Sequence, residues 1–270
     1  MIKDITIGQY FPGKSFLHRL DARTKIILTL VFLVFVFVCK NFWSLGLLCF
    51  FAIFSYLLSR LSPKLALKSL KPLIPIVLLT TVLQLYYIKQ GDIILQWKFI
   101  TITDTGIYTA IFISIRIFAL IVISSLLTYT TSPTDLTDAI EKLLSPLKVF
   151  KVDVHTFAMM MTIALRFIPT LIDEIDRIMS AQKARGADFE SGSIIKRLKA
   201  LIPIFVPLFI SAFKRAIELA DAMSCRCYTG EGRTRLRQMK MTYRDIVAYA
   251  VTALVCGGMV ALNIIFEHLI

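Results

Sequence analysis

The sequence contains little of what metal centres, disulfide frameworks and catalytic sites are made of. It has three histidines, at positions 18, 155 and 268, and five cysteines, none of which form a Cys-x-x-Cys pair. Because no Cys-x-x-Cys pair exists and the number of cysteines is odd, neither a disulfide framework nor a zinc ribbon is indicated. The histidines are scattered and do not cluster with cysteines or carboxylates at metal-ligand spacing. We therefore expect no metal, no other cofactor and no catalytic residue.

Acidic residues are also scarce, because 18 Asp and Glu stand against 31 Lys and Arg. In a soluble protein this excess would suggest a nucleic-acid partner. However, the mean hydropathy is +0.73, and the apolar residues are gathered into long runs, which is typical of a membrane protein. We therefore expect an all-α, multi-pass membrane protein that is surrounded by the lipid bilayer and binds no nucleic acid.

Five apolar segments predict membrane-spanning helices, at about residues 26–39, 42–58, 72–88, 106–129 and 246–266. The first two, read as one helix, would be about 50 Å long, which exceeds a hydrocarbon core of about 30 Å, so a hairpin of two spans fits better. Arg116 lies inside the fourth segment. It either holds this span to its neighbours or faces a partner.

The distribution of Lys and Arg predicts the orientation. Residues 1–25 carry five of them, residues 59–71 four and residues 132–245 eighteen, whereas the alternate connections carry at most two. Basic connections stay in the cytoplasm. We therefore expect a cytoplasmic N-terminus and an external C-terminus, which agrees with an odd number of spans.

Three domains follow: residues 1–131 with four spans, an insert at 132–245, and a last span at 246–270. The insert predicts three helices, of which the first begins after the capping residue Ser132. The second covers about residues 153–185 and the third about residues 193–227.

The two long helices of the insert are expected at or below the inner membrane face. The apolar run of the third, Leu201–Phe213, has thirteen residues, or about 20 Å of helix, which is short for a span. If both helices crossed the membrane, the turn between them would export five basic residues, which contradicts the charge rule. These residues are Lys183, Arg185, Lys196, Arg197 and Lys199.

Both long helices are amphipathic, with wide apolar faces. Part of each face is expected to pack within the insert, and the remainder is a candidate partner surface. The candidate residues are Ile168, Leu171, Ile172, Ile175, Ile178 and Met179 on the second helix, and Phe205, Phe209 and Phe213 on the third.

Each long helix ends in an arginine among small residues, as Ala184-Arg185-Gly186 and as Cys225-Arg226-Cys227. A cation suits the negative end of a helix, so either arginine alone needs no function to explain it. Two such ends in one insert, each with small neighbours that permit close approach, favour a docking role.

Together with the stretch Tyr10–Lys25 (YFPGKSFLHRLDARTK), these features resemble the transmembrane (T) component of energy-coupling factor transporters, in the CbiQ/EcfT family of bacterial ATP-driven vitamin and metal importers. The resemblance implies that the two long helices cross as an X. It also implies that Arg185 and Arg226 each enter a groove on one of two ABC-type ATPase subunits, identical or different. Ala184, Gly186, Cys225 and Cys227 would then be close-packing neighbours.

The resemblance further implies that the apolar faces hold a small membrane-embedded substrate-binding protein, of which several can be interchangeable. Cys227 stands where the family pattern has glycine, which leaves open whether both helices end in the same geometry.

Other readings have less support. A self-contained secondary transporter usually shows paired repeats and broken midplane helices, and a membrane-embedded enzyme needs converging catalytic groups; we find neither pattern. Gly8–Ser15 fits the phosphate-binding pattern G-x-x-x-x-G-K-S, but no parallel sheet can follow it, so we interpret the match as chance.

Overall fold

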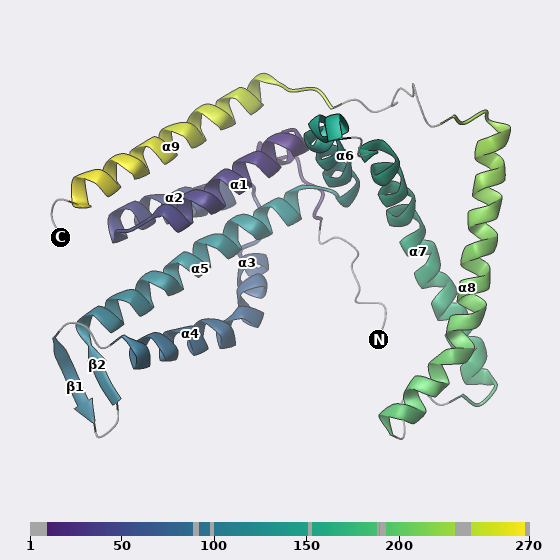
Figure 1. Ribbon diagram of the computed structural model, residues 1–270, viewed down its shortest axis with the longest axis horizontal. Helices are drawn as coiled ribbons and strands as arrows, with labels where there is room; N and C mark the ends of the chain where they lie inside the picture. Colours follow the sequence, from purple (N-terminus) through teal and green to yellow (C-terminus); the bar gives the residue numbers. More distant parts are fainter. Residues whose placement is uncertain are drawn as a thin grey trace. The chain divides into compact units, whose positions relative to one another are not determined.

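The fold is built from α-helices, as the apolar runs predict. The computed structural model describes residues 10–88, 92–97, 100–150, 153–187, 189, 193–229 and 239–267. Figure 1 shows the elements, which we give here in chain order. They are α1 (Ala22–Val38), α2 (Phe42–Leu58), α3 (Pro63–Leu70), α4 (Ile74–Tyr87), β1 (Ile93–Trp97), β2 (Ile100–Thr103), α5 (Asp104–Thr130), α6 (Pro133–Leu144), α7 (Val154–Ala184), α8 (Ile194–Cys225) and α9 (Tyr243–Glu267).

The helices follow the predicted segments, with two differences. The third predicted span starts earlier and is interrupted between α3 and α4 by a 3-10 turn at Lys71–Leu73. Pro72 causes the interruption, because it has no N–H to donate and disfavours the helical conformation of the preceding residue. The antiparallel hairpin of β1 and β2, between α4 and α5, is absent from the sequence prediction.

Among the described residues, five helical stretches are long and apolar enough to cross a membrane: Pro63–Tyr87, Asp104–Thr130, Val154–Ala184, Leu198–Cys225 and Tyr243–Phe266. Three of them match predicted spans. The other two are α7 and α8, whereas α1 and α2 have 17 residues each, or about 26 Å of helix. That α7 and α8 lie at the inner face stays a prediction. This prediction rests on the basic residues of the turn between the two helices. Of these residues, the side chains of Lys196 and Arg197 lie outside the part of the chain that the structure describes.

The chain divides into two compact units. One comprises Gly8–Ala139 with Met239–Ile270, and the other includes Ile140–Gln238. The first holds α1 to α5 and α9, and the second holds α7 and α8.

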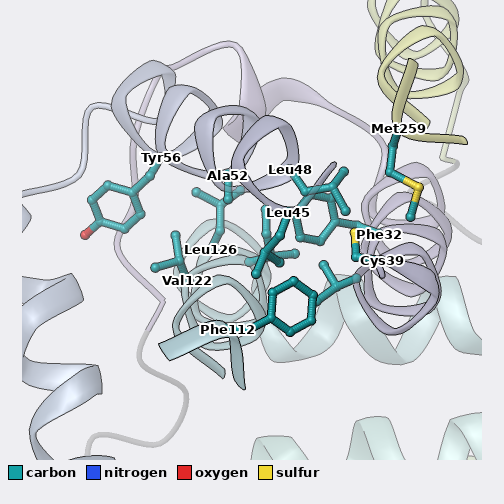
Figure 2. Close-up of a cluster of buried hydrophobic side chains, with 12 residues drawn as sticks. Phe32, Cys39, Leu45, Leu48, Ala52, Tyr56, Phe112, Val122, Leu126 and Met259 are labelled. Atoms are coloured by element: carbon teal, nitrogen blue, oxygen red, sulfur yellow. The ribbon is translucent and has the colours of Figure 1, made fainter. Parts of the chain in front are cut away.

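A cluster of buried side chains joins α1, α2, α5 and α9 in the first unit (Figure 2). On α1, Phe32 and Val36 stand one turn apart and are almost fully covered. They meet Leu45 and Leu48 from α2 and Met259 from α9, and α5 adds its own apolar side chains. Because lipid tails are as apolar as these residues, close packing rather than transfer out of water stabilises the cluster.

Asp245 joins the beginnings of α1 and α9. Its carboxylate accepts the backbone N–H of Asp21 at 2.9 Å and that of Thr242 at 2.7 Å, and the residue is 1% exposed. Asp21 caps α1 by accepting the N–H of Arg23 at 3.0 Å and also pairs with the Arg23 guanidinium at 2.9 Å. Arg23 donates in turn to the carbonyl of Met239 at 3.2 Å. A continuous hydrogen-bond network therefore fixes both helix starts at one end of this unit.

The end of α5 is tied to the same place. The buried Lys25 ammonium donates to the carbonyl of Thr130 at 2.8 Å. Phe11 donates its N–H to the carbonyl of Tyr129 at 3.0 Å, and the two rings meet edge to face with centroids 5.8 Å apart. A buried charge needs such a partner, so these contacts specify where α1 meets α5.

His18 holds the segment before α1 in place. Its Nε2 lies 3.0 Å from the carbonyl oxygen of Phe11, which can only accept, so Nε2 carries the proton and Nδ1 accepts from the Ser15 hydroxyl at 2.6 Å. A Cβ at Gly13 would come within 2.7 Å of the imidazole, which explains the glycine. The Ser15 hydroxyl, which a phosphate-binding loop would need for its ligand, is therefore bonded to His18. Gly8, the first residue of the phosphate-binding pattern, lies outside the described residues.

The same end of the unit also receives the loop after α2. Side chains from the segments 11–18 and 59–65 line one hollow there, and the Ser69 hydroxyl bonds to the hydroxyl of Tyr129. Within the first unit, the basic segments before α1 and after α2 therefore lie at one end, as the alternation of charge predicts. That this end faces the cytoplasm stays a prediction.

At the other end of α1, Arg116 satisfies a carbonyl that the helix leaves free. Its Nη2 donates to the carbonyl of Cys39 at 2.7 Å, and its guanidinium lies 4.7 Å from the centroid of the Phe112 ring. The last four carbonyls of a helix have no partner within the helix. Of the two roles open for Arg116, the structure therefore shows the first, which is to hold α5 to its neighbours.

Asn263 of α9 completes this arrangement. Its Nδ2 donates to the carbonyl of Val38 at 3.1 Å, and its Oδ1 accepts the N–H of Lys40 at 3.3 Å. The turn between α1 and α2 is thus satisfied by side chains from α5 and α9, which is the condition for irregular backbone inside an apolar bundle.

Replacing Arg116 should destabilise the first unit. In an Arg116→Met variant the carbonyl of Cys39 loses its charged donor in a part-buried site, which costs about 1–3 kcal/mol. Thermal unfolding of the purified chain in detergent measures this effect. Arg166→Met, at an exposed position of α7, is the control and should leave the melting temperature unchanged. Equal melting temperatures for the two variants would contradict the assigned role.

Acid should weaken the segment that His18 holds. Burial lowers the pKa of His18 from its usual 6.5, so the unfolded chain binds this proton more tightly than the folded chain does. The free energy of unfolding should fall as the pH drops from 6.5 towards the folded-state pKa. Melting temperatures of wild type and His18→Gln between pH 7.5 and 5.5 test this, because the variant should show the smaller decrease. An identical decrease would remove His18 as the cause.

Candidate functional site

The end of α7 is a Schellman motif around Arg185. Gly186 has φ +86°, its N–H donates to the carbonyl of Lys183 at 3.0 Å, and the N–H of Ala187 donates to the carbonyl of Gln182 at 2.9 Å. These are the two hydrogen bonds that define the motif. They fix the backbone on both sides of Arg185, which is exposed.

The end of α8 has the same geometry around Arg226. Cys227 has φ +52°, its N–H donates to the carbonyl of Ser224 at 2.9 Å, and the N–H of Tyr228 donates to the carbonyl of Met223 at 3.1 Å. Cys227 therefore occupies the position that Gly186 has in α7. The two helices end in the same backbone geometry, which the sequence had left open. The left-handed conformation costs a residue with a Cβ about 1–2 kcal/mol, and the two hydrogen bonds offset it.

The residues beside both arginines are small and open to a partner. Ala184 and Gly186 are exposed at the end of α7, and Cys225 and Cys227 are exposed at the end of α8. All five cysteines of the chain are free thiols.

The helices α7 and α8 are antiparallel neighbours (Figure 1). Arg215 pairs with Glu174 at 3.2 Å, and the Tyr228 hydroxyl donates to the sulfur of Met159 at 2.8 Å. The end of α8 therefore lies beside the beginning of α7, and the end of α7 lies far from it. At 1.5 Å per residue between Met159 and Arg185, the two arginine ends are separated by about 40 Å along the helix pair.

The Arg215–Glu174 ion pair and the Tyr228–Met159 hydrogen bond connect α7 to α8 at two points along the helices. Figure 1 also shows α8 bent towards its N-terminal part. Pro203 and Pro207 lie inside this helix, and each removes a backbone donor, which is the usual cause of such a bend. The X-shaped crossing that the resemblance implies stays a prediction.

The candidate apolar residues fall into two classes. On α7, all six are partly buried, so this set contributes to packing as well as to the surface. On α8, Phe205, Phe209 and Phe213 are 63%, 66% and 55% exposed, and the last two rings contact each other with centroids 4.6 Å apart. The α8 set is therefore predominantly surface.

Sequence reasoning missed further members of this surface. They are large apolar side chains of α8 that are more than half exposed: Ile195, Leu198, Ile202, Val206, Ile210 and Ile217. The signal was available, because these positions repeat every three to four residues beside the phenylalanines.

Among the residues that the structure describes, no group of three His, Cys, Asp or Glu could hold a metal ion.

Comparison with known proteins places these features in a family. Residues 13–236 match the CbiQ family, described as cobalt transport protein. The chain is 51% identical over 267 residues to the energy-coupling factor transporter transmembrane protein EcfT of Ruminiclostridium cellulolyticum, covering 98% of this chain and 100% of that protein. It is 48% identical over 246 residues to the EcfT protein of Bacillus subtilis, covering 91% and 93%. The resemblance stated from the sequence is confirmed.

The two helix ends predict opposite responses to exchange of their cap residues. Cys227→Gly should stabilise the chain by about 1 kcal/mol, because glycine adopts positive φ without strain, and Gly186→Ala should destabilise it by about the same amount. Melting temperatures of the two variants measure these effects, and each variant is the control for the other. If Cys227→Gly lowered the melting temperature, the cap assigned to α8 would be wrong.

Proposed function

The chain belongs to the CbiQ family, and from this premise we propose that it is the non-catalytic subunit that couples two ABC-type ATPases to a small membrane-embedded substrate-binding protein in an ATP-driven importer of vitamins or other micronutrients. Its apolar helices and its bacterial relatives make it a multi-pass membrane protein of bacteria. The observation that carries the proposal is the pair of exposed arginines at matching helix ends, about 40 Å apart.

Each arginine suits a docking contact on an ATPase. Guanidinium is a rigid donor fork for carboxylates and carbonyls, and desolvated arginines are frequent interface hot spots. The Schellman motifs fix the backbone that carries Arg185 and Arg226, so little conformational entropy is lost on binding. The small neighbours let the partner approach the helix end closely.

The same helix pair can transmit motion. Because Arg215–Glu174 and Tyr228–Met159 connect α7 to α8 at two levels, a displacement imposed at one arginine end moves the pair together rather than one helix alone. The exposed phenylalanine face of α8 then moves with it. This face, with the surface part of the α7 set, is where we place the substrate-binding protein.

The orientation completes the proposal. The N-terminus and the α6–α8 region face the cytoplasm, where ATPases are available, and the C-terminus faces outside. The gathering of the basic segments at one end of the first unit supports this orientation.

Co-purification from native membranes with a tag on this chain tests the proposal. Wild type should bring two ATPase subunits and a small membrane protein. Arg185→Glu/Arg226→Glu should lose the ATPases, because the acceptor groups of a groove that binds a guanidinium repel the carboxylate of glutamate. The matched control, Phe205→Ala/Phe209→Ala/Phe213→Ala, should keep the ATPases and lose the small membrane protein. A wild-type chain that purifies alone would contradict the coupling role, and ATPases retained after both charge reversals would contradict docking by arginine.

A further inference from the structure

A basic hollow opens at the end of the first unit where the helix starts are tied together. It has a volume of about 540 Å³ and lies between the segment of residues 11–18 and the loop of residues 59–65. Neither the arginine ends nor the phenylalanine face contributes to it, so the proposed coupling role leaves it without a function.

The charge of the hollow has one sign. Lys14, Arg60 and Lys64 line it and are exposed, and none of its described lining residues is acidic. Among its other polar side chains, His18 bonds to Phe11 and Ser15, and the Ser59 hydroxyl donates to the carbonyl of Tyr56. Three cations around one cavity, without a carboxylate, favour an anionic ligand.

The walls of the hollow are fixed by the fold. Arg60 has φ +56°, and its N–H donates to the carbonyl of Leu57 at 3.1 Å. The Tyr56 hydroxyl donates to the carbonyl of Ser62 at 2.9 Å, which holds the loop against α2. On the facing wall, the imidazole of His18 lies against Gly13. The cations are therefore presented by ordered backbone on both sides.

The neighbouring residues identify the kind of anion. Phe16 and Leu17 of the first segment, and Leu58, which directly precedes the second, line a separate apolar cavity of about 360 Å³, which α1, α2, α5 and α9 complete. A basic site and an apolar cavity on adjacent residues of one membrane protein match the two parts of a phospholipid. A free phosphate ion would use only the first.

We propose that the hollow binds the phosphate headgroup of an anionic phospholipid, with Lys14, Arg60 and Lys64 around the phosphate and an acyl chain against the apolar cavity. Basic pockets on the cytoplasmic side of membrane helices bind anionic headgroups by this chemistry. The bound lipid would bridge the loop after α2 to the segment that precedes α1. This proposal does not depend on the coupling role.

Lipid retention by the full-length chain tests the proposal. The chain is reconstituted in phosphatidylcholine bilayers with a minor fraction of phosphatidylglycerol, extracted in mild detergent, and analysed by mass spectrometry of the intact protein–lipid complex. Wild type should retain phosphatidylglycerol in preference to phosphatidylcholine. Each lost cation should weaken this retention by about fivefold, so Lys14→Gln/Lys64→Gln should lower it by about 25-fold and Arg60→Gln by about fivefold.

The control separates the hollow from general surface charge. Lys68→Gln/Lys71→Gln also removes two positive charges, from residues that follow α2 but lie outside the hollow, and it should keep the wild-type preference. Equal losses in the two double variants, or no loss in either, would overturn the proposal. Displacement of the lipid by millimolar inorganic phosphate would assign the hollow to a free anion instead. Equal melting temperatures of all variants in phosphatidylcholine confirm that each is folded.

Discussion

The first N–H groups and the last carbonyls of a helix have no partner within the helix, so they need one wherever water is scarce. This requirement determines where several buried polar side chains of the chain lie. Arg116 and Asn263 supply donors to the last carbonyls of α1. Lys25 does the same for the end of α5. Asp245 accepts the N–H groups that precede α1 and α9. These side chains determine which helix end meets which, whereas the apolar cluster, which lacks direction, only keeps the helices together.

The helices themselves could be predicted because their determinants are local. Apolar runs set the lengths, and the boundaries of α2 match those expected. The hydroxyl of Ser132 does accept the N–H of Asp135 at 3.1 Å, as its capping pattern predicts. The network at the start of α1 could not be predicted, since Asp21 and Asp245 are far apart in sequence and neither carries a motif that indicates the other. Arg116 stands out in the sequence because a charge inside an apolar span is costly. Its role could not be predicted, because its partner is a backbone carbonyl, which no sequence pattern reveals.

The candidate site shows a similar division. The arginine ends could be recognised from small residues around a cation. Periodicity found the apolar faces but not how they divide between packing and surface, because that depends on the antiparallel contact of α7 with α8. The equivalence of the two ends could not be read from Cys227, which is an unusual residue for positive φ.

Matching caps on antiparallel helices have a consequence for symmetry. Two antiparallel helices that end in the same backbone geometry are related, at their ends, by an approximate two-fold axis perpendicular to them. A partner that is itself a dimer has a two-fold axis of its own, so a single chain can present one equivalent contact to each half of it. The side chains break this equivalence, because glycine and alanine flank one arginine and cysteines flank the other. The two helix ends are therefore alike in backbone geometry and different in the residues that flank each arginine.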